Sequence, residues 1–256
     1  MTDLVTIALL AGAGLLAGVV GTAGGITSLI SYPALLAVGL PALSANVANI
    51  VALVACWPGS ALASQPELVG HGRWLRRWVP LSALGGAAGS LLLLSTPPGL
   101  FARVVPFLVA AGSLALLAQP WLTARHQRHR RAHPSPASSA VLPLGLITMS
   151  VYNGYFGAGS GVMTLALLLI TSEPHLATAN ALKNMVIGAG TLLSATAFAA
   201  FAPVDWTAVA PLALGMFLGS TLGPRIARRL PAPLLRWLVV LIGLGLAIQL
   251  WLNPNG

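Results

Sequence analysis

Ten apolar segments, separated by short polar connections, constrain the fold of this chain more than any other feature of its sequence. They lie at residues 4–20, 25–39, 42–64, 74–95, 99–119, 140–156, 160–172, 176–201, 206–223 and 233–252. A membrane-spanning helix needs about 20 apolar residues, and eight of the segments approach that length. Only 7 % of all residues are charged, against about 25 % in a soluble domain. We therefore predict an all-α integral membrane protein with about 8–10 membrane segments, multi-pass in a bacterial inner membrane and in contact with its lipids.

Two glycine-rich stretches, at residues 18–28 and 153–164, interrupt these apolar segments. A membrane helix does not need glycines at such density, whereas a backbone that turns or approaches another group closely does. The segments that follow, 25–39 and 160–172, are too short for a standard span. We predict broken helices at both stretches, and half-helices, re-entrant segments and full spans remain alternatives for the two short segments.

The two halves of the chain share several motifs in the same order. Residues 43–49 resemble residues 177–183, residues 21–25 align with 157–161, and residues 85–90 resemble 215–220. This order predicts an internal duplication. Its parts are a first membrane repeat at 1–119, a basic cytoplasmic loop at 120–139 and a second membrane repeat at 140–256.

The arginines predict how the segments are oriented. With five segments in each half, every arginine except Arg103 falls on or beside one face, which the positive-inside rule makes cytoplasmic. An odd number of segments in each half makes the two repeats inverted and places both termini outside. Arginines in short loops between apolar segments report orientation, so we expect no nucleic-acid partner for the net charge of +9.

Matched glycine breaks in two inverted repeats indicate a transport site. The first N–H groups of a helix lack internal partners, and the helix dipole makes that end partially positive, so it can bind an anion. Close packing of small residues is the alternative explanation. The candidate substrate-binding residues are Gly21, Thr22, Gly24, Gly25, Thr27, Ser28, Asn46, Asn49, Asn153, Gly157, Ser160, Gly161, Thr164, Asn180 and Lys183.

Lys183 is the only lysine of the chain, and it lies about two turns inside an apolar segment. An ionisable residue at membrane depth indicates function, although a lysine that extends to the interface is the alternative. Its counterpart in the first repeat, Asn49, is neutral, so we expect one positively charged site. With one cysteine, no cluster of metal ligands, no catalytic set and no nucleotide-binding motif, the sequence predicts neither an enzyme, nor a metal, nor a cofactor.

Several motifs recur here in a characteristic order: Gly21-Thr22-Ala23-Gly24-Gly25, Tyr32-Pro33-Ala34-Leu35, the two Ala-Asn blocks, Val204-Asp205-Trp206, and Gly215 to Pro224 followed by Arg225 to Pro231. In this order the chain resembles the TauE/SafE sulfite exporter family over nearly its whole length. It departs from the pattern at Ala23 and at His71-Gly72-Arg73-Trp74. The resemblance implies a secondary carrier for sulfite, thiosulfate, sulfoacetate or a related sulfonate.

We therefore expect export of a small sulfur-containing anion by alternating access. An uptake carrier for a small carboxylate, a passive anion channel, and an assembly subunit without transport of its own are the alternatives. The anion, the direction of transport, the coupling ion and a homodimer remain open.

Overall fold

The computed structural model describes residues 3–132, 140–227 and 248, and within these ranges every regular element is a helix. The helices are α1 (Leu4–Gly24), α2 (Ser28–Ala37), α3 (Ala42–Leu53), α4 (Cys56–Ala63), α5 (Gln65–Leu68), α6 (Gly72–Leu94), α7 (Pro98–Ala132), α8 (Val141–Tyr155), α9 (Ser160–Thr171), α10 (Leu176–Phe201) and α11 (Trp206–Ala227). The predicted all-α class is confirmed. The last predicted segment, 233–252, lies outside the described residues except for position 248.

Five units among the described residues are long and apolar enough to cross a membrane. They are α1, α3 together with α4, α6, α10, and α11 as far as Gly223. Their exposed surface is rich in leucine and phenylalanine, as a surface in contact with lipid requires; Leu84 is 65 % exposed and Phe201 is 75 % exposed. The chain is therefore a multi-pass membrane protein.

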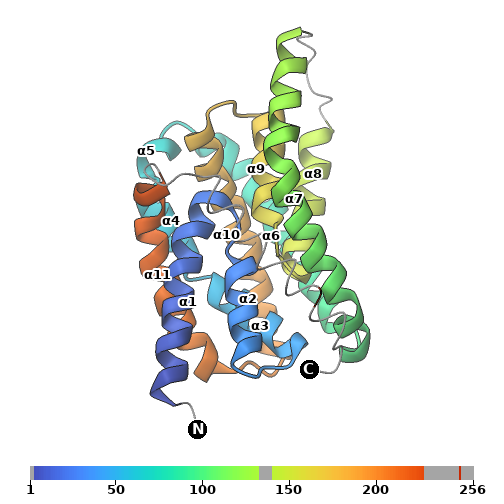
Figure 1. Ribbon diagram of the computed structural model, residues 1–256. Coiled ribbons are helices and arrows are strands. Elements are labelled where there is room, and N and C mark those ends of the chain that lie inside the picture. Colours follow the sequence, from blue (N-terminus) through green and yellow to red (C-terminus); the bar gives the residue numbers. More distant parts are fainter. Residues whose placement is uncertain (1–2, 133–139, 228–247, 249–256) are drawn as a thin grey trace.

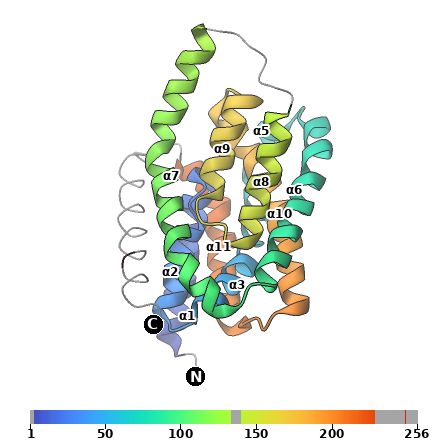
Figure 2. The same cartoon turned by 90° about the vertical axis from the view of Figure 1, so that its right-hand side faces the viewer.

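The helices run roughly parallel to one axis and alternate in direction (Figures 1 and 2). The beginning of α6 and the ends of α7 and α11 lie at the same end of the molecule, uppermost in Figure 1, and the first two of these contain clusters of arginine in the sequence. The beginning of α1 and the connection between α10 and α11 lie at the opposite end. This arrangement is the one that the distribution of arginines predicts.

The two short helices, α2 and α9, are half-helices. With 10 and 12 residues they are roughly 15 and 18 Å long, about half of the ~30 Å hydrocarbon core. Each turns back after a glycine break: α2 runs back toward the end where α1 begins, and α9 toward the end where α8 begins (Figures 1 and 2). The segments at 25–39 and 160–172 therefore do not span the membrane as helices.

Two predicted boundaries were wrong. The basic loop expected at 120–139 is helical as far as Ala132, because α7 continues through the arginine-rich residues. The first glycine stretch ends α1 at Gly24, and the next helix begins only at Ser28. The segment predicted at 42–64 is confirmed as a candidate span, Ala42–Ala63, although it consists of two consecutive helices, α3 and α4.

Small residues let helices from the two halves approach closely. A Cβ atom on Gly18 of α1 would lie 2.5 Å from the Met216 carbonyl oxygen of α11, and one on Gly219 would lie 2.2 Å from the Leu15 oxygen. In the corresponding place of the other half, a Cβ atom on Gly89 of α6 would lie 2.0 Å from the Val151 oxygen of α8. Such backbone contacts drive helix association in lipid, where burial of apolar surface contributes little. Each half thus packs its first helix against the other half.

Candidate functional site

The two glycine breaks, far apart in sequence, meet inside the protein. A Cβ atom on Gly25 would lie 2.5 Å from the carbonyl carbon of Gly161, and one on Gly161 would lie 2.5 Å from the Gly25 Cα atom. No other residue type fits at either position without displacing the backbone. The site is therefore formed by both halves together.

Positive φ angles produce the two turns. Gly25 has φ 79° and closes α1, with its N–H donating to the Gly21 carbonyl at 2.6 Å. In the second break, Gly157 has φ 82° and Gly159 has φ 77°, immediately before α9. Glycine adopts this left-handed conformation without the steric cost that a Cβ atom imposes. The chain can thus reverse inside the bundle over only three or four residues.

A cavity of about 60 Å³ adjoins the meeting point of the breaks. A cavity needs about 10–15 Å³ to hold one water, so this volume has room for several waters or for a small ligand. Most of the candidate residues line it: Gly21, Thr22, Gly25, Thr27, Ser28, Asn153, Gly157, Ser160, Gly161 and Lys183. Their geometric convergence is a finding, and their role in binding stays a prediction.

The remaining candidates lie outside the cavity lining: Gly24, Asn46, Asn49, Thr164 and Asn180. Two of them form hydrogen bonds with the other half of the chain. Asn46 Nδ2 donates to the Tyr155 carbonyl at the end of α8 (2.9 Å), and Asn180 Nδ2 donates to the Thr22 carbonyl near the end of α1 (2.9 Å). Each asparagine therefore bonds to the helix that precedes the glycine break of the other half.

Asn49 and Thr164 are buried in the surrounding core. Asn49 is fully buried, and its Oδ1 accepts a hydrogen bond from Ser31 Oγ at 2.5 Å. Thr164, at 2 % exposure, lies one turn beyond the beginning of α9. Gly24 occupies the last turn of α1 and is half-buried. The sequence could not distinguish these residues from those that line the cavity.

Several lining residues were not predicted from the sequence: Leu53, Cys56, Trp57, Ser60, Asn184, Ile187, Gly188 and Thr191. Asn184, Ile187, Gly188 and Thr191 follow Lys183 at helical spacing along one face of α10, so the helical period could have identified them. Trp57 and its neighbours come from the α3–α4 junction. No sequence signal connects that junction with the glycine breaks.

Lys183 is a buried cation without a carboxylate partner. It is 1 % exposed, and its Nζ donates to Asn180 Oδ1 at 2.7 Å. The chain contains four acidic residues, Asp3, Glu67, Glu173 and Asp205, and none of them lines the cavity. A buried charge is costly unless it is paired. In its ammonium form, Lys183 would therefore be stabilised by an anion bound beside it.

The beginning of α9 supplies further donors. The N–H groups of Ser160 and Met163 are bonded to Gly157 and Gly159, whereas those of Gly161 and Val162 find no hydrogen-bond partner within the described part of the chain. Unpaired N–H groups at the first turn of a helix favour an anion. Ser160 and Gly161 both line the cavity, so this helix end faces it.

Asn153 holds the second break in place. Ser160 Oγ donates to Asn153 Oδ1 at 2.8 Å, and Asn153 Nδ2 donates to Thr191 Oγ1 at 3.0 Å. The amide thus links the end of α8, the beginning of α9 and the cavity-facing side of α10. This network orients the hydroxyl groups around the cavity.

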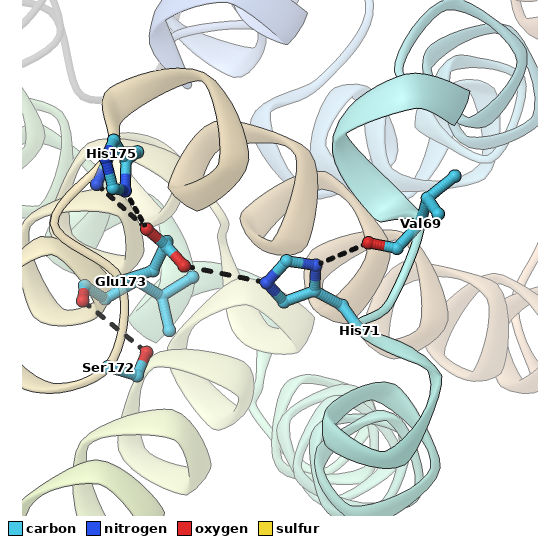
Figure 3. A network of polar contacts seen from close by, with 6 residues as sticks. Val69, His71, Ser172, Glu173 and His175 are labelled. Atoms are coloured by element: carbon cyan, nitrogen blue, oxygen red, sulfur yellow. Dashed lines mark hydrogen bonds and ion pairs between the residues drawn. The ribbon is translucent and has the colours of Figure 1, made fainter.

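A second polar network lies at the end of the molecule that we predict to be cytoplasmic (Figure 3). Glu173, between α9 and α10, accepts hydrogen bonds from the backbone N–H (3.0 Å) and ring Nδ1 (2.9 Å) of His175. Its other oxygen lies 3.6 Å from Nε2 of His71, whose Nδ1 donates to the Val69 carbonyl. The carboxylate therefore connects a loop of the first half with a loop of the second.

Partial burial of Glu173 opposes its ionisation, but the hydrogen bonds and charge of His175 and the contact with His71 outweigh it. They hold the pKa of the carboxyl below its ordinary value. Two histidines and one carboxylate come together here, yet within the described residues no group of three has the geometry of a metal site.

A multi-pass helical bundle with a small cavity between two glycine-interrupted helices is typical of membrane transport proteins. The family model of the sulfite exporters TauE/SafE matches residues 7–250. The chain belongs to this family and is a membrane transporter.

Three relatives are described only as probable transporters. The chain is 28 % identical over 246 residues to the probable membrane transporter protein ORF9 of a Sinorhizobium species, covering 95 % of this chain and 91 % of the relative. It is 27 % identical over 236 residues to a probable membrane transporter protein of Haemophilus influenzae (90 % and 88 % covered) and 24 % identical over 251 residues to YfcA of Escherichia coli K12 (94 % and 88 % covered). No solved structure matches the chain.

Proposed function

We propose that the protein exports a small sulfur-containing anion, such as sulfite or a small sulfonate, and binds it in the cavity between the glycine breaks. The observation that carries the proposal is Lys183, a cation buried without a carboxylate beside that cavity. The ammonium group would balance the charge of the anion, and hydroxyl and backbone N–H donors would hold its oxygens. The description of the matching family as sulfite exporters supports the choice of a sulfur oxyanion.

Alternating access is the proposed mode of transport. The corresponding contacts of Asn46 and Asn180 support two inverted repeats, because each braces the helix before the other repeat's break. Rocking of one repeat against the other would expose the cavity first to one side and then to the other. A membrane potential that is negative inside favours anion exit by about 2.3 kcal/mol per charge per 100 mV, so export needs no coupled ion.

The test is binding of sulfite to purified protein that carries the Lys183→Gln substitution. Removal of one partner of a buried charge pair costs about 2–5 kcal/mol, so we expect the Kd to rise by roughly 30-fold or more. Isothermal titration calorimetry measures this change. Arg76→Gln, which removes an exposed charge from the first turns of α6, is the control and should leave the Kd unchanged. Equal affinity in wild-type and Lys183→Gln protein would overturn the proposed site.

Counterflow in liposomes distinguishes a carrier from a channel. Vesicles loaded with unlabelled sulfite should accumulate labelled sulfite transiently, because a carrier exchanges the two. A channel only dissipates the gradient, and an assembly subunit produces no flux at all. The same assay with a small carboxylate tests the alternative substrate.

A further inference from the structure

Trp57 brings to the cavity wall a hydrogen-bond donor that no described residue accepts. It lies in the first turn of α4, and four lining residues follow one another at helical spacing there: Leu53, Cys56, Trp57 and Ser60. One face of the α3–α4 unit therefore borders the cavity. The indole Nε1 of Trp57 is buried and finds no acceptor within the described part of the chain. Such a group is costly to leave unpaired, and nearly all buried N–H groups in proteins have a partner.

Close packing on Gly188 of α10 sets the position of the indole ring. A Cβ atom on Gly188 would lie 2.1 Å from Cδ1 of Trp57 and 2.7 Å from its Nε1, so the ring edge that carries the N–H faces this glycine. Gly188 lines the cavity together with its helical neighbours Asn184 and Thr191. The N–H group therefore lies next to the cavity-facing side of α10, the helix that also carries Lys183.

Several other polar side chains of the lining already donate within the protein. Thr22 Oγ1 donates to the Gly18 carbonyl at 2.7 Å, and Ser60 Oγ donates to the Trp57 carbonyl at 3.0 Å. Three further side chains donate to protein acceptors in the same way: Asn153, Ser160 and Asn184. The indole N–H of Trp57 has no such acceptor, and Lys183 has one, although its ammonium group carries three N–H bonds. These two side chains are therefore suited to donate to a ligand.

We propose that Trp57 is a ligand-binding residue of the cavity, and that its indole N–H donates a hydrogen bond to an oxygen of the bound anion. This role rests on the proposed function and adds a residue to the same site. Hydrogen bonds to a charged acceptor are roughly twice as strong as neutral ones, so the anion satisfies the N–H of Trp57 as well as the charge of Lys183. An indole N–H only donates, so it favours an unprotonated oxygen, as in sulfite or a sulfonate.

The substitution Trp57→Phe tests this role, because it keeps an aromatic ring and removes the N–H group. We expect the Kd for sulfite, measured by calorimetric titration of the purified protein, to rise at least about tenfold, since the lost bond has a charged acceptor. Trp74→Phe is the matched control. The Nε1 atom of Trp74 is also buried without a partner among the described residues, but Trp74 lies outside the cavity lining, so the Kd should not change.

The indole N–H groups can also be observed directly in the wild-type protein. With isotope-labelled tryptophan each indole N–H gives its own NMR signal, and the signal that is missing in Trp57→Phe belongs to Trp57. Addition of sulfite should shift this signal, because its N–H gains an acceptor, while the Trp74 signal stays in place. If no indole signal shifts at saturating sulfite, the donor role is refuted.

The outcomes separate the role of Trp57 from the proposed function. A raised Kd in Lys183→Gln together with an unchanged Kd in Trp57→Phe would leave the anion site standing and remove Trp57 from it. If the wild-type protein does not bind sulfite at all, the proposed function fails, and the role of Trp57 fails with it.

Discussion

At the scale of single residues, the backbones of Gly25 and Gly161 approach each other so closely that neither position has room for a side chain. Each glycine occupies the space that a Cβ atom of the other would need, and Gly25 also has a positive φ. The two requirements are independent, because one concerns the neighbour and the other concerns the backbone of the residue itself. Both arise from the reversal of the chain inside a packed interior.

The substitutions Gly25→Ala and Gly161→Ala should therefore each destabilise the protein by about 1–3 kcal/mol and abolish sulfite counterflow. Thermal unfolding in detergent and transport in liposomes measure the two effects. Gly12→Ala is the matched control in α1, because a Cβ atom there meets nothing within 4 Å. Native stability and transport in both break variants would contradict the close-contact model.

At the scale of elements, the connections between helices are held by few polar contacts. Asp205 caps α11, where its Oδ1 accepts hydrogen bonds from the Thr207 and Ala208 N–H groups and from the Thr207 hydroxyl. At the other end of the molecule, Glu173 joins the α5–α6 and α9–α10 loops through two histidines. These contacts hold the ends of neighbouring helices in place.

Replacing Glu173 by glutamine should lower stability near neutral pH by about 1 kcal/mol or less, the usual worth of a solvent-accessible ion pair. The pKa of Glu173 is lowered in the folded protein, so its contribution is present above the ordinary carboxyl pKa and is lost as the pH falls through the folded pKa. The difference in melting temperature between wild-type and Glu173→Gln protein should therefore close below about pH 4.

A series of melting curves between pH 7 and pH 3 measures this dependence. Asp3→Asn is the control, since Asp3 makes no side-chain capping bond to α1. A Glu173→Gln difference that stays constant across the series would mean that the carboxylate charge does not contribute.

At the scale of the whole molecule, the arginine-bearing ends define one face and the α10–α11 connection the other. Single cysteines in a Cys56→Ser background can test this orientation. In right-side-out membrane vesicles, an impermeant maleimide should label Pro203→Cys, at the α10–α11 connection, and should not label Arg76→Cys. After permeabilisation both exposed positions should react. The opposite pattern would reverse the predicted topology.

The sequence alone determined that the chain is helical and lies in a membrane, because long apolar segments with so few charges cannot remain in water. It also located the two breaks and the isolated Lys183, because glycine clusters and a charge are conspicuous in apolar segments. Local composition was sufficient for these features. Local composition did not predict the end of α7. The helix continues through arginines that we had expected to lie in a loop.

Only the tertiary structure decided which residues meet at the cavity. Trp57 and Leu53 join the glycine breaks through packing, and Asn180 reaches the Thr22 carbonyl across 158 positions of sequence. The motifs of one half carry no information on what they touch in the other, because apolar helices can associate at many heights and angles with similar energy in lipid. The specific approach of Gly25 to Gly161 selects one arrangement, and that contact places Lys183 beside a small cavity without any carboxylate.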